Sequence, residues 1–337
     1  MKTETIQLDH GSGGLAGQEL IKNIFLSRLD NPELAALEDC ALVDTEIGRL
    51  AFSTDSYVVD PLFFPGGDIG LLAVLGTIND LAMRGARPLC LSLAMILEEG
   101  CPLADLQRIV ASIHTASSAS GVPVVTGDTK VVPKGKGDKV FINTSGIGLV
   151  DKETEISASM ASPGDVILLS GSMGDHGITI LTQRAGLSMQ GRLQSDTMAL
   201  HDLVRKMLKI KSGAVHTLRD PTRGGVATSL NEIAETAGVG IELDEEKIPL
   251  HDEVAAACEI LGMDPLYLAN EGKCLALVQA DSAREILQVM RSMPEGAEAA
   301  IIGKATEAPA GRVLLKTIAG GSRIVSPLSG EPLPRIC

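Results

Sequence analysis

Acidic residues recur at the ends of apolar strands and inside an apolar helix. Carboxylates in such places can converge, and several buried together repel one another unless a cation neutralises them. Their hard oxygen ligands suit Mg²⁺ that bridges the phosphates of a nucleotide such as ATP. The alternative is that each residue only caps a turn or a helix. The predicted metal-binding set is Asp39, Asp55, Asp80, Asp128 and Asp220.

A glycine-rich loop near the start of the chain is a second candidate for phosphate binding. It consists of Gly11, Ser12, Gly13 and Gly14. Glycine lets consecutive N–H groups point at one anion, so we expect a phosphate cradle; a flexible hinge is the alternative. A dinucleotide site is disfavoured because the acidic residue expected about twenty residues further on is not evident. The sequence contains no G-x-x-x-x-G-K-[ST] motif, which excludes a P-loop enzyme.

Two residues of the chain suit proton and phosphoryl transfer. Lys130 lies two residues after Asp128 and can neutralise charge on a transferring phosphoryl group, unless it is a surface lysine paired with a neighbouring acid. Glu271 precedes an apolar strand and can act as a general base. Its Asn-Glu-Gly-Lys surroundings are equally suited to a hairpin turn.

The sequence ends in a cysteine, Cys337, behind Pro332 and Pro334. Prolines keep a segment extended, and the stretch from Pro327 onward can reach about 30 Å. Such a tail can carry a sulfur to another protein or into a pocket of its own. A frayed terminus that happens to contain a cysteine is the alternative.

Composition narrows the class of protein. The 337 residues favour two domains, and the formal charge of −14 argues against a nucleic-acid surface. No apolar run approaches the roughly 18 residues that span a bilayer, so we expect a soluble cytoplasmic protein without membrane contact. The six cysteines lie far apart, which argues against a zinc site or a disulfide framework.

These residues need a layered scaffold of strands and helices to bring them together. We place the boundary between two domains near residue 155, where a polar stretch precedes a Pro-Gly turn. Apolar patterning predicts helices over residues 18–29, 69–85, 103–120, 176–185, 225–237 and 282–293. It predicts strands over residues 6–10, 50–54, 89–96, 122–126, 140–149, 166–170, 274–279 and 299–302. Asp68 suits the N-cap of the second helix, and residues 134–139 suit a hairpin turn.

Motifs along nearly the whole chain carry a family resemblance. They lie at residues 10–14, 52–55, 61–67, 125–132, 174–177, 220–225, 269–273 and at the Pro-Arg-Ile-Cys ending. The sequence resembles the HypE family of hydrogenase maturation proteins, within the superfamily of aminoimidazole ribonucleotide synthetase, thiamine-phosphate kinase and selenophosphate synthetase. The terminal cysteine distinguishes this family, since selenophosphate synthetase would carry its reactive residue near the N-terminus and this chain has no cysteine before Cys40.

The resemblance implies a two-domain aminoimidazole ribonucleotide synthetase-like fold. Residues 1–155 would form an N-terminal α/β domain that binds ATP and pairs with a second copy in a homodimer. Residues 156–321 would form a C-terminal α+β, ferredoxin-like domain. Residues 322–337 would be a mobile tail that carries Cys337.

The resemblance also implies a reaction. A HypF-type carbamoyltransferase would place a carbamoyl group on Cys337, and this protein would use ATP to dehydrate that group to a thiocyanate. The cyanide would then pass to iron on a HypC–HypD scaffold for the [NiFe]-hydrogenase centre. A phosphotransferase acting on a free small molecule and a non-enzymatic sulfur carrier remain as alternatives. The implied roles are Mg²⁺-ATP binding for Asp55, Asp80, Asp128 and Asp220 with help from Asp39, phosphoryl stabilisation for Lys130 and proton removal for Glu271.

Overall fold

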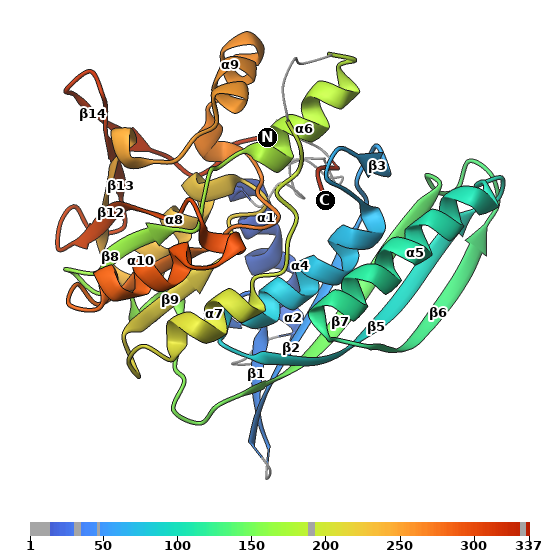
Figure 1. Cartoon of the computed structure of the whole chain (residues 1–337), viewed down its shortest axis with the longest axis horizontal. Coiled ribbons are helices and arrows are strands. Elements are labelled where there is room, and N and C mark those ends of the chain that lie inside the picture. The colour runs from blue at the N-terminus through green and yellow to red at the C-terminus, as the bar shows by residue number, and fades with distance from the viewer. Residues whose placement is uncertain (1–13, 30–34, 46–47, 188–192, 331–334) are drawn as a thin grey trace.

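The computed structural model describes residues 14–29, 35–45, 48–187, 193–330 and 335–337. Two sheets, each with its own helices, lie side by side (Figure 1). The strands of the first sheet end at Val150 and those of the second begin at Val166. This arrangement places the functional residues near the junction of two layered halves.

The first sheet has the strand order β1-β2-β7-β5-β6. Its strands are β1 (Ala41–Thr45), β2 (Gly48–Tyr57), β5 (Arg87–Glu98), β6 (Val124–Val132) and β7 (Val140–Val150). Neighbours are antiparallel except β5 and β6, which are parallel. A small ribbon of β3 (Phe63–Phe64) and β4 (Gly67–Asp68) precedes the central helix.

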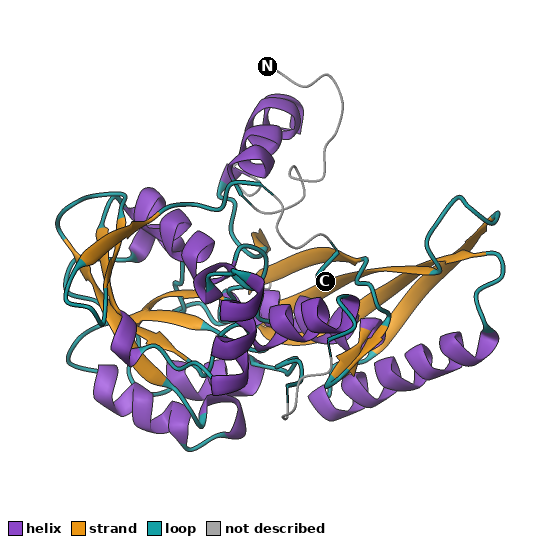
Figure 2. Ribbon diagram, turned by 90° about the horizontal axis from the view of Figure 1, so that it is seen from above, coloured by secondary structure: helices purple, strands orange, loops and turns teal. Residues whose placement is uncertain are grey.

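Helices α4 (Ile69–Met83) and α5 (Leu103–Ser120) lie on one face of the five-stranded sheet (Figure 2). Asp68 caps α4 as predicted, because its Oδ1 accepts hydrogen bonds from the N–H groups of Gly70 and Leu71 at 2.8 and 2.9 Å. Nearly every residue of α4 is buried, so this helix forms the centre of the core.

The opposite face of the same sheet carries exposed apolar side chains. Phe52 on β2 lies opposite Ile147 on β7 in the strand register. These two side chains are 46% and 38% exposed. An apolar, uncovered sheet face is typical of a surface that another protein covers.

The second sheet has the order β14-β13-β10-β12-β8-β11-β9. Its strands are β8 (Val166–Leu169), β9 (Val215–Arg219), β10 (Gly240–Asp244), β11 (Leu275–Val278), β12 (Ala300–Thr306), β13 (Val313–Lys316) and β14 (Ser322–Val325). The helices that accompany it are α6 (Asp175–Arg184), α7 (His201–Leu208), α8 (Gly225–Ala237), α9 (Asp252–Leu261) and α10 (Ala283–Arg291). Short 3₁₀ segments occur at η3 (Ala158–Met160), η4 (Glu245–Lys247), η5 (Pro265–Tyr267) and η6 (Pro294–Gly296).

The predicted first helix is present as three consecutive segments, α1 (Leu15–Leu20), the π-helical η2 (Ile21–Phe25) and α2 (Leu26–Leu29). The helix projects from the body of the protein (Figure 2). Its predicted apolar face is not buried in this chain, since Ile21 and Ile24 are 37% and 57% exposed. The periodicity therefore identified the helix correctly but not its burial.

Two turn predictions in the first half are wrong. Asp128 and Lys130 lie within β6, which continues to Val132 instead of ending at a Gly-Asp-Thr turn. The stretch 134–139 is a turn but does not close a hairpin, because β6 and β7 pair with opposite sides of β5. The strand predicted at 6–10 lies outside the described residues.

The other predicted helices and strands are present with ends shifted by a few residues. In the described part of the chain, none of the helices has both the length and the apolar character needed to cross a bilayer.

Candidate active site

An acidic cavity of about 740 Å³ lies where the two halves meet. Its walls include side chains from β2, α4, the loop after β9 and the segment that leads into β11. The sequence-predicted residues that line it are Asp39, Asp55, Asp80, Asp220, Glu271 and Cys337. Residues more than two hundred positions apart thus contribute to one site.

The first half contributes Asp55 and Asp80. Asp55 lies on β2, two residues beyond Ser53, so both side chains point to the same face of the sheet. Ser53 Oγ donates a hydrogen bond to Asp80 Oδ2 at 2.6 Å. This bond holds Asp80 on α4 against the strand that carries Asp55.

The second half contributes Asp220, which follows β9. The preceding Arg219 forms an ion pair with Asp39 of the first half, with 2.6 Å between Nη1 and Oδ1. The other carboxylate oxygen of Asp39 is buried and has no hydrogen-bond partner among the described residues. Asp39 is therefore partly neutralised by the protein, whereas Asp220 has no ion pair within the described ranges.

Burial and nearby carboxylates raise the pKa values of Asp80 and Asp220. Loss of water raises the pKa of Asp220 to about 8, with the charge of Asp39 as the next cause. The pKa of Asp80 is raised well above its ordinary value by burial and then by Asp220 and Asp55. Such a cluster favours a bound proton or cation over free carboxylates.

Glu271 completes the acidic set from the loop between η5 and β11. Burial raises its pKa well above the ordinary value, and Asp196 and Asp220 raise it further. Its Oε1 is buried and unpaired within the described part of the protein. Carboxyl oxygens of this kind suit a hard cation, yet no three described His, Cys, Asp or Glu side chains enclose a metal site by themselves.

Asn79, next to Asp80 on α4, joins the two halves directly. Its Nδ2 donates to the carbonyl oxygens of Met198 and Glu271 at 3.0 and 3.3 Å. Its Oδ1 accepts from the N–H of Leu200 at 2.8 Å. One buried amide thus fixes the backbone of Glu271 relative to the helix that carries Asp80.

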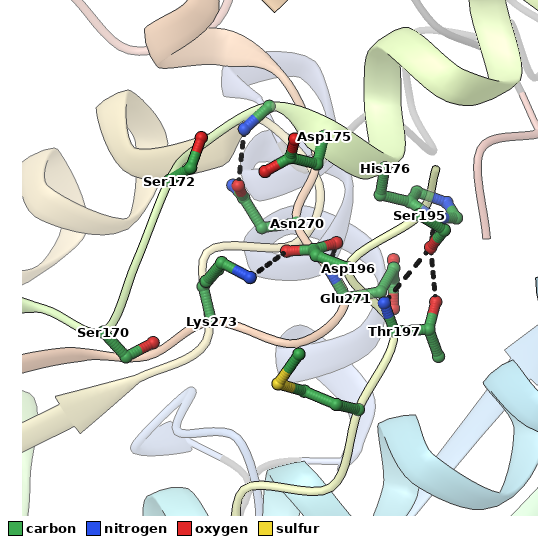
Figure 3. A network of polar contacts seen from close by, with 12 residues as sticks. Ser170, Ser172, Asp175, His176, Ser195, Asp196, Thr197, Asn270, Glu271 and Lys273 are labelled. Atoms are coloured by element: carbon green, nitrogen blue, oxygen red, sulfur yellow. Dashed lines mark hydrogen bonds and ion pairs between the residues drawn. The ribbon is translucent and has the colours of Figure 1, made fainter. Parts of the chain in front are cut away.

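A separate polar network lies on the other side of the Glu271 segment (Figure 3). Lys273 Nζ lies 3.3 Å from Asp196 Oδ2, and both side chains are buried. Asp196 Oδ1 accepts from the backbone N–H of Glu271 at 3.0 Å. Gly272 must be glycine here, because a Cβ would lie 1.9 Å from the Asp196 carbonyl oxygen. The Asn-Glu-Gly-Lys stretch is therefore a packed site element and not a hairpin turn.

The last three residues of the tail are docked against the first half. The N–H of Val58 donates to the Cys337 carbonyl oxygen at 2.9 Å, and Arg335 Nε donates to the Val58 carbonyl oxygen at 2.8 Å. Arg335 also forms an ion pair with Asp138. Ile336 is 4% exposed and packs in the same apolar cluster as Phe64.

His176 on α6 recognises the docked tail. Its Nε2 lies 2.7 Å from the Ile336 carbonyl oxygen, which can only accept, so Nε2 carries the proton. Burial lowers the pKa of His176, which favours the neutral ring. Its Nδ1 must then accept from Ser195 Oγ at 2.8 Å, and the Ser195 oxygen accepts from Thr197 N–H at 3.2 Å.

Two family models match the two halves of the chain in turn. The family model "AIR synthase related protein, N-terminal domain" matches residues 37–150, and the corresponding C-terminal domain model matches residues 162–316. The chain is 53% identical to carbamoyl dehydratase HypE of Azotobacter vinelandii, over 100% of this chain and 98% of that protein. It is 47% identical to carbamoyl dehydratase HypE of Escherichia coli K12, over 98% and 99%.

This chain belongs to the HypE family. Its fold matches a crystal structure of the hydrogenase maturation protein HypE in complex with ATP, with TM-score 0.83, 50% identity and coverage of 99% of this chain and 100% of the other. It matches a chain of the HypE–HypF complex with TM-score 0.87, 46% identity and coverage of 92% and 99%. A ThiL complexed with AMPPCP and TMP shares the fold at 19% identity and TM-score 0.71. These findings confirm the predicted family and the two-domain aminoimidazole ribonucleotide synthetase-like fold.

Two predicted residues of the HypE site lie away from the cavity within one chain. Asp128 and Lys130 form an ion pair with each other at 3.0 Å on the exposed edge strand β6. Their side chains are 63% and 71% exposed. The alternative reading of Lys130 as a surface lysine paired with its neighbour describes the isolated chain correctly.

The glycine loop is largely outside the described residues. Gly11, Ser12 and Gly13 belong to the undescribed stretch, so the cradle stays a prediction. Gly14 is described: it is buried and precedes α1 as its N-cap.

Sequence reasoning missed two residues of the site. Arg223 lines the cavity within the quoted motif at 220–225, and the negative charge available at Cys337 is the largest cause of its raised pKa. His176 lies in the quoted motif at 174–177, for which the sequence suggests a helix cap or a ligand contact but no contact with the tail. The charge of Arg223 inside an otherwise acidic motif was the available signal; nothing in the sequence linked His176 to the tail.

Proposed function

We propose that this protein is an ATP-dependent carbamoyl dehydratase that acts on its own Cys337. It would convert an S-carbamoyl group into a thiocyanate and so supply cyanide ligands for the iron of the [NiFe]-hydrogenase centre. The docked tail carries this proposal, because Cys337 lines the same cavity as Glu271, Asp55, Asp80 and Asp220. The ATP-bound HypE relative supports the nucleotide.

The chemistry requires the removal of one oxygen and two protons from the carbamoyl group. An amide oxygen is a poor leaving group, and transfer of a phosphoryl group from ATP turns it into a phosphate that can leave. The carbon–nitrogen bond becomes a triple bond as nitrogen loses its protons. The products are the S-cyanated cysteine, ADP and phosphate.

Glu271 is the residue that we propose for proton removal. Its raised pKa makes it a stronger base than an ordinary carboxylate once it is ionised. Arg223 lowers that pKa and thereby favours the ionised form. Asn79 and Asp196 hold its backbone, so the base is fixed in position before the substrate arrives.

We propose that Asp55, Asp80 and Asp220, with help from Asp39, hold Mg²⁺ together with the phosphates of ATP. The unpaired oxygen of Asp39 and the raised pKa values of Asp80 and Asp220 fit a hard cation. Magnesium supplies positive charge that offsets the carboxylates and the phosphates. Because the carboxylates alone enclose no metal site, phosphate oxygens and water would complete the coordination.

A homodimer would give roles to Asp128 and Lys130. Their side chains lie on the face of β6 that points away from α4 and α5. This is the same uncovered sheet face that carries Phe52 and Ile147. We propose that two copies pack through this face, so that Asp128 and Lys130 of one copy serve the nucleotide site of the other. Phe52→Asp should then yield monomers in sedimentation velocity and lose dehydration; a dimeric variant would contradict this.

The remaining partners follow from the path of the carbamoyl group. We propose a HypF-type carbamoyltransferase as the donor, in line with the HypE–HypF complex of a relative, and a HypC–HypD scaffold as the acceptor. Both require the docked end of the tail, residues 335–337, to leave the cavity and present Cys337 outside. The start of the predicted tail, Ser322–Val325, is strand β14 of the second sheet and would stay in place. Such an exchange would take place in the cytoplasm.

Mass spectrometry of the tail peptide tests the function. The protein is incubated with a HypF-type carbamoyltransferase, carbamoyl phosphate and ATP, and Cys337 should gain a carbamoyl group and then lose one water. Glu271→Gln should retain the carbamoyl group and ATP binding but not lose water. Cys101→Ala, which changes a thiol outside the cavity, is the matched control and should react like wild type. Equal ATP turnover by Cys337→Ala on a soluble substrate would overturn the proposal.

A further inference from the structure

His176 contacts two different segments through its two ring nitrogens. Nε2 donates to the carbonyl oxygen of Ile336, the residue just before the substrate cysteine. Nδ1 accepts from Ser195, at the start of the segment 195–197. The ring is fully buried and packs edge-on against Phe64, with 5.5 Å between ring centroids, so its orientation is fixed.

The segment 195–197 holds the general base on its other side. Asp196 accepts from the N–H of Glu271, and its backbone packs directly against Gly272. Ser195 N–H donates to the Pro65 carbonyl oxygen at 2.8 Å, which anchors the segment to the first half. His176 therefore bonds both the tail and the segment that supports Glu271.

We propose that His176 is a positioning residue that ties docking of the tail to the placement of the general base. Its Nε2–H fixes the backbone of Ile336 and so places the Cys337 sulfur in the cavity. Through Ser195, its Nδ1 holds the segment that supports Glu271. This inference rests on the proposed dehydration, and it predicts that an undocked tail leaves the base less firmly held.

Two substitutions test the roles of the two ring nitrogens of His176 separately. In His176→Gln the side-chain amide can reach the position of Nε2 and donate to Ile336, but the acceptor for Ser195 is lost. In His176→Asn the amide oxygen can accept from Ser195 at the position of Nδ1, but the donor to Ile336 is lost. Ser195→Ala removes the hydrogen bond between Ser195 and His176 Nδ1 and leaves the histidine in place.

The first measurement is the rate at which iodoacetamide alkylates Cys337 in the full-length protein. His176→Asn should raise this rate about fivefold to tenfold, because it loses the one buried hydrogen bond to Ile336. His176→Gln and Ser195→Ala keep that bond, so their rates should stay within about twofold of wild type. His114→Asn, which alters an exposed histidine on α5, is the matched control. Equal alkylation of the Asn and Gln variants would overturn the docking role.

The second measurement is single-turnover loss of water from carbamoylated protein in the presence of ATP. His176→Gln and Ser195→Ala should slow this step severalfold although Cys337 stays protected and ATP still binds. A wild-type rate in Ser195→Ala would overturn the link to Glu271. If wild-type protein fails to lose water, the proposed function fails, while the alkylation result still decides whether His176 docks the tail.

Discussion

Asp196 and Asp220 lie on either side of the Glu271 segment and are buried to the same extent, with 7% of each residue exposed. Asp196 has Lys273 as an ionic partner and the N–H of Glu271 as a donor. Asp220 faces other carboxylates, and its pKa is raised to about 8. Two equally buried aspartates thus have different roles. Asp196 is ion-paired and stabilises the structure, whereas Asp220 lies among other carboxylates and favours a bound cation.

Breaking the paired charge should have the largest effect on stability. Asp196→Asn leaves Lys273 buried without its ionic partner, which should lower the free energy of unfolding by about 3–5 kcal/mol in urea titrations. Asp281→Asn removes the exposed partner of Lys211, at 2.9 Å, and should cost less than about 1 kcal/mol. Similar losses in the two variants would show that Asp196 is not a structural ion pair.

Removing the uncompensated charge should have the opposite sign. Asp220→Asn removes a carboxyl group whose ionised form is disfavoured first by burial and then by Asp39, so without ligands it should stabilise the protein by on the order of 2 kcal/mol at neutral pH. The same variant should lose ATP-dependent loss of water from carbamoylated Cys337 by about 100-fold or more. If the variant were destabilised but still active, Asp220 would have a structural role like that of Asp196 and no role in the reaction.

The pH dependence of stability should be the smallest of these effects. The pKa of Asp220 is 3.8 ordinarily and about 8 in the folded protein, so its contribution is fully present below about pH 4 and is lost as the pH rises through 8. Ligand-free protein should therefore melt at lower temperature at pH 8 than at pH 6, and Mg²⁺-ATP should reduce the difference. Scanning calorimetry with and without EDTA measures both, and a flat profile in the ligand-free protein would contradict the charge cluster.

The sequence allowed much of the cavity to be predicted, because carboxylates next to or within apolar strands and helices carry a strong local signal. Asp55, Asp80 and Asp220 follow from that rule and converge. Asp128 obeys the same rule but lies on an edge strand outside the cavity, since strand order is a long-range property that local patterning does not encode. The docked position of the tail depends on contacts with Val58 and His176, which no spacing in the sequence indicates.

Helix positions were predicted well both for α4, which is buried almost all round, and for α5, which buries one face. The apolar side of the first helix is an exception, because Ile21 and Ile24 remain exposed in a single chain. An apolar stripe indicates that something covers the residues but not which surface does so. The same ambiguity applies to Phe52 and Ile147, which a second copy of the chain would cover in the proposed homodimer.

Asn79 has a consequence for how the protein can work repeatedly. Its three hydrogen bonds to the backbone of Met198, Leu200 and Glu271 clamp the walls of the cavity to each other. Separation of the two halves would break all three buried bonds, whereas withdrawal of residues 335–337 leaves them intact. These bonds favour a working cycle in which the end of the tail moves while the two halves stay joined.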